Sequence, residues 1–147
     1  MRGGRVAIAA VVAALLGLVF AGSALACSCL RSTPAESLAR SDAAIVGQLL
    51  AVESRGPGRA AYRYRVLRVF RGHDAIERGS ALRVLGSRGG AACGLPETVG
   101  ARFGLFLSAY RGRWTGSLCG VVSPRQLRIA AQKAEGASRS RPLDCVS

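Results

Sequence analysis

The sequence has few of the residues that build catalytic sites. It contains a single histidine, His73, and only 8 acidic residues in 147. A histidine-based catalytic set is therefore limited to one member, and the carboxylates Asp74, Glu77 and Glu97 fall in predicted loops with no paired motif. The length leaves no room for a second, catalytic domain. These absences predict that the protein is not an enzyme and that it carries no cofactor of its own.

Acidic residues are far outnumbered by basic ones, and almost all of the basic residues are arginines. Lysine and arginine together number 21, which gives a formal net charge of +13. Strong basicity favours encounters with anionic surfaces such as envelope polymers, phospholipid headgroups or acidic proteins. Arginine content can also reflect genome composition, so the charge alone leaves the partner open.

No apolar run reaches the ~20 residues that a typical membrane-spanning helix needs. The longest, Val6–Phe20, follows Arg2 and Arg5 and precedes the small-residue site Ala24–Ala26. That order is typical of a secretory signal peptide, residues 1–26, which is cleaved before Cys27. We expect a secreted protein with no membrane span after cleavage, and export makes nucleic acid an unexpected partner.

Two other fates of the leader stay open. A retained anchor is one, and lipid attachment at Cys27 is the other, although Ala24 is a poor match for the leucine usual three places before a lipidated cysteine. Because two basic residues and no acidic ones lie in the leader, residues 27–147 carry a charge of +11.

All five cysteines lie in the exported part, where oxidising conditions let disulfides persist. They are Cys27, Cys29, Cys93, Cys119 and Cys145. An odd number leaves one thiol over, and about fifteen arrangements of two bridges are possible from the sequence alone.

The remaining chain is predicted to be mostly β, with a short helix at each end. Thr33 and Pro34 are a helix start, and Gly47 marks a bend or bulge inside the first strand. The predicted helices are 34–40 and 124–134, and the predicted strands are 43–53, 61–70, 82–85, 103–110 and 114–122. Five strands with glycine-rich turns favour a small closed barrel. The domain is expected to cover 27–135, followed by a flexible basic tail, 136–147.

The second strand changes its buried face along its length. Tyr62, Tyr64 and Val66 share one face, whereas Arg63 and Arg65 take the other, and the apolar set then switches sides. This switch predicts a bulge near Val66, which lets a sheet curl toward closure.

Several short motifs together resemble the tissue inhibitors of metalloproteinases and the related netrin-like domains. They are Cys27–Cys29 directly after the cleavage site, Ser41–Val46, Val69–Gly72, Cys93–Gly94 and Leu118–Cys119. The resemblance spans nearly the whole exported chain and implies a five-stranded OB-fold-like closed barrel, stapled by disulfides.

The resemblance also implies a disulfide pattern. Cys27 would bond to Cys93 and Cys29 to Cys119, while Cys145 would be left over. Ala39 occupies the position of another early cysteine of the family, so the third family bridge would be missing.

In that family the free amino terminus is the inhibitory group. The resemblance implies that the α-amino nitrogen and carbonyl oxygen of Cys27 bind the catalytic zinc of a secreted metallopeptidase. Ser28 would enter the specificity pocket, Leu30 would add apolar contact, and Cys29 would complete the inhibitory edge. The hairpin turn around Pro57 is short and no carboxy-terminal subdomain is expected, which reduces the expected contact area.

Three alternatives remain open beside inhibition. The cysteines can simply staple an envelope structural protein, or a reduced Cys-X-Cys pair can bind copper. The barrel can also bind anionic envelope or matrix polymers through arginines of its second strand. These arginines are Arg63, Arg65, Arg68 and Arg71. In the contrasting interpretation, these arginines are exposed to solvent without a ligand, and Tyr62, Tyr64 and Trp114 belong to the core.

Overall fold

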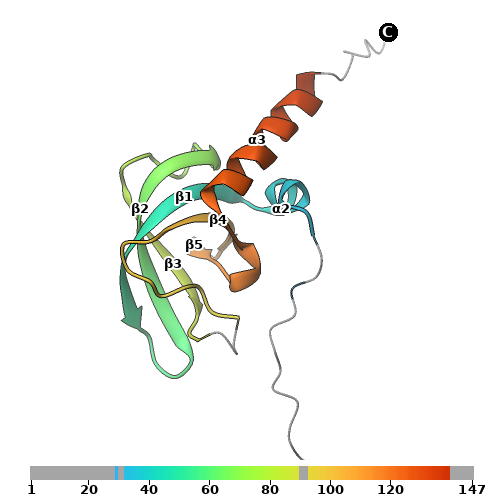
Figure 1. Ribbon diagram of the computed structural model, residues 1–147. Coiled ribbons are helices and arrows are strands. Elements are labelled where there is room, and N and C mark those ends of the chain that lie inside the picture. The colour runs from blue at the N-terminus through green and yellow to red at the C-terminus, as the bar shows by residue number, and fades with distance from the viewer. Residues whose placement is uncertain (1–28, 30–31, 90–92, 140–147) are drawn as a thin grey trace, which may run out of the picture.

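The computed structural model describes residue 29, residues 32–89 and residues 93–139. A curved β-sheet forms most of this part, with one helix before it and one after it (Figure 1). The elements are α2 (Pro34–Arg40), β1 (Ala43–Ser54), β2 (Arg59–Arg71), β3 (Ala81–Ser87), β4 (Arg102–Tyr110), β5 (Arg113–Thr115), the 3-10 helix η2 (Leu118–Gly120), β6 (Val121–Val122) and α3 (Pro124–Arg139).

Five strands close into a barrel in the order β1-β2-β3-β5-β4, with β4 returning to pair with β1. The first half of β1, Ala43–Gln48, has neighbours on both sides, because β2 pairs along one edge and β4 along the other. All of these pairs are antiparallel except β3 with β5. This arrangement confirms the predicted OB-fold-like barrel.

Irregular pairing between β1 and β2 accompanies the closure. Val46 pairs with Arg68 and Gly47 with Val66, so Leu67 has no partner in β1 and forms the bulge predicted near Val66. A Cβ atom on Gly47 would lie 3.2 Å from Cβ of Tyr64, so glycine lets the two strands approach closely. Such bulges increase local twist, which a sheet needs in order to close.

The barrel interior contains the main hydrophobic core. Tyr62, Tyr64 and Val66 are buried there, whereas Arg63 and Arg65 are exposed, as the alternation in β2 predicts. Other fully buried members of this core are Ile45, Leu49, Val84, Leu105 and Leu107. The inward set thus comes from four strands, and burial of these apolar surfaces is the main stabilising contribution.

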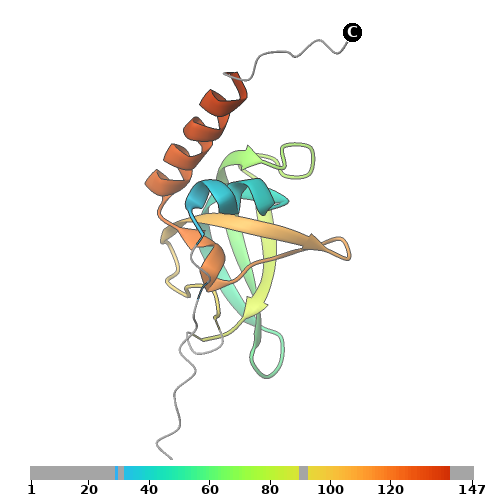
Figure 2. The ribbon, with the colours of Figure 1, turned by 90° about the vertical axis from the view of Figure 1, so that its right-hand side faces the viewer.

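A second apolar cluster joins both helices to the outside of the barrel. Leu38 of α2 and Leu127, Ala130 and Ala131 of α3 pack against Phe106 and its neighbours. Figure 2 shows the two helices together at one end of the barrel, with the second half of α3 extending beyond it. Residues 132–139 are accordingly exposed.

Helix α2 begins where the sequence predicts. The hydroxyl oxygen of Thr33 accepts a 3.3 Å hydrogen bond from the backbone N–H of Glu36, and Oε2 of Glu36 accepts a 2.7 Å bond from the backbone N–H of Thr33. This capping box satisfies free donors at the start of the helix. The hydrogen bond from the Thr33 backbone also lowers the pKa of Glu36.

Two predicted elements have different bounds. The expected strand 114–122 is divided, because after Thr115 the N–H of Gly116 bonds to Leu85 and that of Leu118 to Cys93. Helix α3 does not stop at residue 134 but continues to Arg139, so the first part of the predicted tail is helical. A single glycine such as Gly136 weakens a helix by about 1 kcal/mol and need not end it. Residues 140–147 lie outside the described part.

Within the described residues, neither helix is both long enough and apolar enough to cross a membrane. The predicted signal peptide, residues 1–26, lies outside these residues.

Candidate functional site: the disulfide-anchored edge

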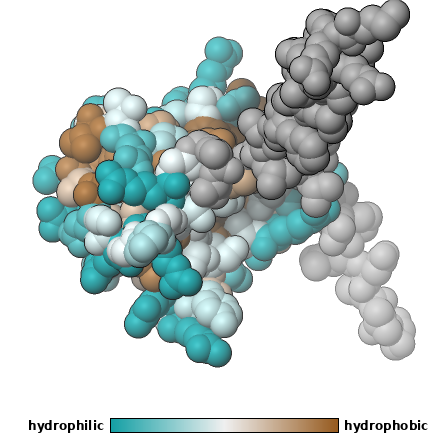
Figure 3. Space-filling view, turned by 90° about the horizontal axis from the view of Figure 1, so that it is seen from below, coloured by the Kyte–Doolittle hydropathy of each residue, from teal (hydrophilic) through white to brown (hydrophobic). Residues whose placement is uncertain are grey.

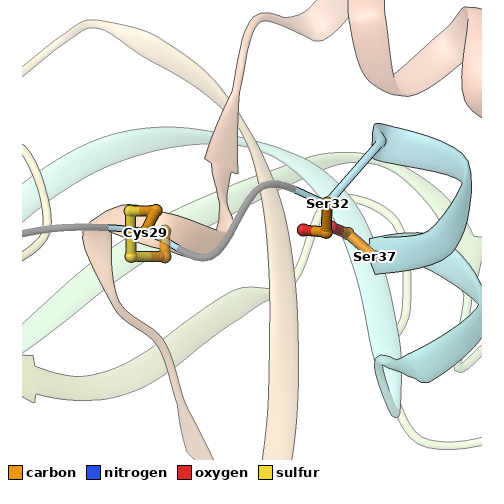
Figure 4. The surroundings of a disulfide bond; sticks show 4 residues. Cys29, Ser32 and Ser37 are labelled. Atoms are coloured by element: carbon orange, nitrogen blue, oxygen red, sulfur yellow. A yellow bond between two sulfur atoms is a disulfide. The ribbon is translucent and has the colours of Figure 1, made fainter.

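The Cys29–Cys119 disulfide joins the segment before α2 to η2. These residues are 90 positions apart in the sequence, and their Cα atoms are 5.3 Å apart. Figure 4 shows the bond near the start of α2, where the hydroxyl oxygens of Ser32 and Ser37 are 3.0 Å apart. This is the pairing that the resemblance implies, and a disulfide is typical of an oxidising, extracytoplasmic compartment.

Cys93 is the second anchoring cysteine on the barrel. It is disulfide-bonded, and its predicted partner, Cys27, lies outside the described residues, as do Ser28, Leu30 and Cys145. The carbonyl oxygen of Cys93 accepts a 2.9 Å hydrogen bond from the N–H of Leu118, the residue before Cys119. Cys93 and Cys119 therefore belong to neighbouring segments at one edge of the barrel.

Position 94, directly after Cys93, has room only for glycine. A Cβ atom on Gly94 would lie 2.5 Å from the carbonyl oxygen of Ser87, closer than real Cβ contacts come. Cys93 itself has a φ of 56°, in the left-handed region that non-glycine residues seldom adopt. The Cys-Gly pair thus holds its loop tightly against the end of β3.

A small pocket of about 380 Å³ adjoins the disulfide. Hydroxyl-bearing side chains from α2, β4, β5 and the segment after β5 line it together with Cys119, and they include Ser37, Ser108, Thr115 and Ser117. Two of these hydroxyls are already engaged, because Ser37 Oγ lies 3.0 Å from Ser32 Oγ and Thr115 Oγ1 donates a 3.1 Å bond to the Ser108 carbonyl. The pocket gives the disulfide-anchored edge a polar, indented border.

A polar network that sequence analysis did not predict supports the loop carrying Cys93. Tyr62 Oη donates a 2.8 Å hydrogen bond to the carbonyl oxygen of Ser87 and lies 3.5 Å from Oε1 of Glu97, which pairs with Arg88 at 3.3 Å. Burial raises the pKa of Tyr62, and the negative charge of Glu97 adds to this rise. The one sequence signal for this network is Tyr62, a predicted inward-facing tyrosine whose hydroxyl needs a hydrogen-bond partner.

The four arginines proposed for polyanion contact are exposed, but the tyrosines that alternate with them in the sequence do not share their surface. The guanidinium carbon of Arg68 lies 4.9 Å from the ring centroid of Phe70, and Arg71 donates a 3.2 Å bond to the carbonyl oxygen of Leu38. Arg63 and Arg65 are exposed on the outer face of β2. Tyr62 and Tyr64 are buried in the barrel, so they have no face free for stacking.

The other candidate groups are dispersed. His73, Asp74 and Glu77 are exposed in the connection between β2 and β3, as predicted for turn residues. Trp114 packs partly buried against the barrel core. Within residues 29, 32–89 and 93–139, no three potential metal ligands gather in one place.

Comparison with protein families and with curated sequences identifies no relative. No protein-family model and no curated protein sequence matches this chain. Membership of the metalloproteinase-inhibitor or netrin-like family therefore remains a proposal, supported by the barrel topology and by the Cys29–Cys119 pairing.

Proposed function

We propose that the protein is a secreted inhibitor of zinc metallopeptidases and acts through Cys27, the first residue of its exported form. The observation that carries this proposal is the Cys29–Cys119 disulfide, which fastens the chain two residues after that terminus to an OB-type barrel. Cys93, the partner proposed for Cys27, is disulfide-bonded beside the same anchoring point. Two neighbouring disulfides would hold the inhibitory edge in one conformation before it binds the peptidase.

The chemistry of the terminus supplies two zinc ligands. An α-amino group has a pKa of about 8, so it can lose its proton to a metal near neutral pH. The nitrogen and carbonyl oxygen of Cys27 can close a five-membered chelate ring on a catalytic zinc, which keeps an open position. Binding there would displace the water that the peptidase activates. The zinc belongs to the target enzyme.

Neighbouring residues would supply the contacts that make the inhibitor selective. Ser28 would enter the specificity pocket of the peptidase, and Leu30 would contact its apolar wall. Leu118, next to the disulfide, is 37% exposed and adds apolar surface on the barrel side. Because the crosslinks order this edge in advance, little conformational entropy is lost on binding.

The test begins with the protein exported from a secreting host. Intact mass and amino-terminal sequencing should give a chain that starts at Cys27 with a free amine and lacks the four hydrogens removed by two disulfides. Hydrolysis of peptide substrates by a panel of secreted zinc peptidases should then be inhibited at a one-to-one ratio.

The matched control carries one additional alanine before Cys27. It keeps the disulfides and the barrel but moves the amino group away from the zinc, so inhibition should be lost while the unfolding midpoint stays the same. Acyl groups on Cys27, a different first residue, or equal inhibition by the extended form would contradict the proposal.

A further inference from the structure

A second surface, unrelated to the terminus, is an open groove of about 930 Å³ on the barrel. Every charged side chain that lines it is an arginine: Arg55, Arg59, Arg83 and Arg113. We call this surface the arginine groove. Seen from the end that carries the β1–β2 turn, the molecule presents many hydrophilic residues (Figure 3). A concave site lined by one sign of charge focuses the electrostatic field on oppositely charged ligands.

Barrel closure brings these arginines together from three places in the sequence. Arg55 and Arg59 flank the β1–β2 turn and are linked by a 3.0 Å bond from the N–H of Arg55 to the carbonyl of Arg59. Arg83 lies in β3 and Arg113 begins β5, the strand parallel to β3. The positive groups are therefore held by two strands of the sheet and by the turn between β1 and β2.

Most of this charge is not neutralised by other residues that the structure describes. Arg83 pairs with Glu53 at 3.3 Å, and both side chains are about half exposed, so the pair is weak. Among the described residues, no acidic side chain forms an ion pair with Arg55, Arg59 or Arg113. Their guanidinium groups are available to carboxylate or sulfate groups, which they can bind through two parallel hydrogen bonds.

The floor of the groove favours a carbohydrate chain. Gly86 and Gly116 contribute backbone groups to this floor, Ser87 adds a hydroxyl, and Leu85 adds a partly buried apolar patch. Sugar hydroxyls and the apolar faces of sugar rings are suited to such a mixed floor.

The aromatic residues argue against single-stranded nucleic acid, which proteins of this kind bind by stacking bases on exposed rings. Trp114 lines the groove but packs against the core, and Tyr62 is fully buried. Tyr110 is exposed, but the guanidinium of Arg111 lies 5.3 Å from its ring centroid. We propose that the arginine groove binds a linear polysaccharide that carries carboxylate or sulfate groups.

The experiment measures binding of the full exported chain to four probes by calorimetry. They are a heparin-derived hexasaccharide, a galacturonate hexamer, neutral maltohexaose and a short oligothymidylate. We expect one or both anionic glycans to bind, with affinity falling as sodium chloride increases because screening weakens exposed charges. Maltohexaose should not bind measurably.

Two triple variants with the same net charge locate the site. Replacing Arg55, Arg59 and Arg113 by glutamine should lower glycan affinity at least about tenfold, since charge-assisted contacts are lost. Replacing Arg78, Arg125 and Arg128, which are exposed but do not line the groove, should change it less than about threefold. Equal loss in both variants, no binding of either anionic glycan, or tighter binding of oligothymidylate through the groove would overturn the proposal. Peptidase inhibition should be the same in all three proteins, so the two proposals fail independently.

Discussion

The backbone N–H of Leu118 donates a 2.9 Å hydrogen bond to the carbonyl oxygen of Cys93. Since Cys119 follows Leu118 and is bonded to Cys29, the barrel presents two disulfide-forming positions side by side. Two residues separated by one other are at most about 7 Å apart along an extended chain. The two cysteines of a Cys-X-Cys segment are therefore close enough to bond to two neighbouring positions such as Cys93 and Cys119.

Loss of the Cys29–Cys119 bond should destabilise the barrel strongly. The bond closes a loop of 90 residues, for which the chain-entropy model gives about 4.6 kcal/mol. Cys29→Ser, Cys119→Ser and the double variant should all lose a similar free energy of unfolding in urea. A loss below about 1 kcal/mol in the double variant would show that this crosslink contributes little to stability.

Gly94→Ala should lower the free energy of unfolding by about 2 kcal/mol, because the new methyl group would collide with the Ser87 carbonyl. Gly136→Ala is the matched control. Nothing lies within 4 Å of the Cβ position at Gly136, and alanine favours the helix by up to about 1 kcal/mol. Urea unfolding of both variants checks the contrast, and equal effects would be evidence against the tight contact at Gly94.

The two buried tyrosines should respond oppositely to loss of their hydroxyls. Tyr64 Oη is buried and has no hydrogen-bond partner among the described residues, whereas Tyr62 Oη bonds to the Ser87 carbonyl at 2.8 Å. Removing an unpaired buried hydroxyl is neutral or stabilising by about 1 kcal/mol, and removing a paired one costs about 1 kcal/mol. Thermal unfolding of Tyr64→Phe and Tyr62→Phe measures the difference, and a large loss in Tyr64→Phe would contradict the structure.

Stability should fall in alkaline solution. Burial raises the pKa of Tyr64 and of Tyr62 in the folded protein, whereas the pKa of an unfolded tyrosine is about 10. The resulting stabilisation is fully present below pH 10 and is lost as the pH rises above it, because the unfolded chain ionises first. Urea unfolding between pH 8 and about 11.5 measures the slope, which should be smaller in Tyr64→Phe. An unchanged slope would mean that Tyr64 does not contribute.

Local patterns were enough to predict much of the barrel. The Thr33-Pro34 start, the inward tyrosines of β2 and the bulge near Val66 each depend on neighbours in the sequence, and all three are confirmed. The division of the predicted strand 114–122 depends on Leu85 and Cys93, which lie far away in the chain. No local pattern contains that information.

The arginine groove escaped sequence analysis for the same reason. Arginines that recur along one strand, such as Arg63 and Arg65, attract attention in a sequence. Arg55, Arg83 and Arg113 belong to different strands or turns, and only closure of the barrel makes them neighbours. The residues of the inhibitory edge, in contrast, followed from the resemblance, and of these the structure describes Cys29 alone.

Thr115 and Gly116 line both the arginine groove and the small pocket beside Cys119. If both proposals hold, an acidic glycan and a peptidase docked at the disulfide-anchored edge would lie on either side of this shared border. If the bound glycan changes the affinity of the protein for the peptidase by some factor, the bound peptidase must change the affinity for the glycan by the same factor. If both proposals hold, these two shared residues are where an acidic glycan around the protein would modulate inhibition.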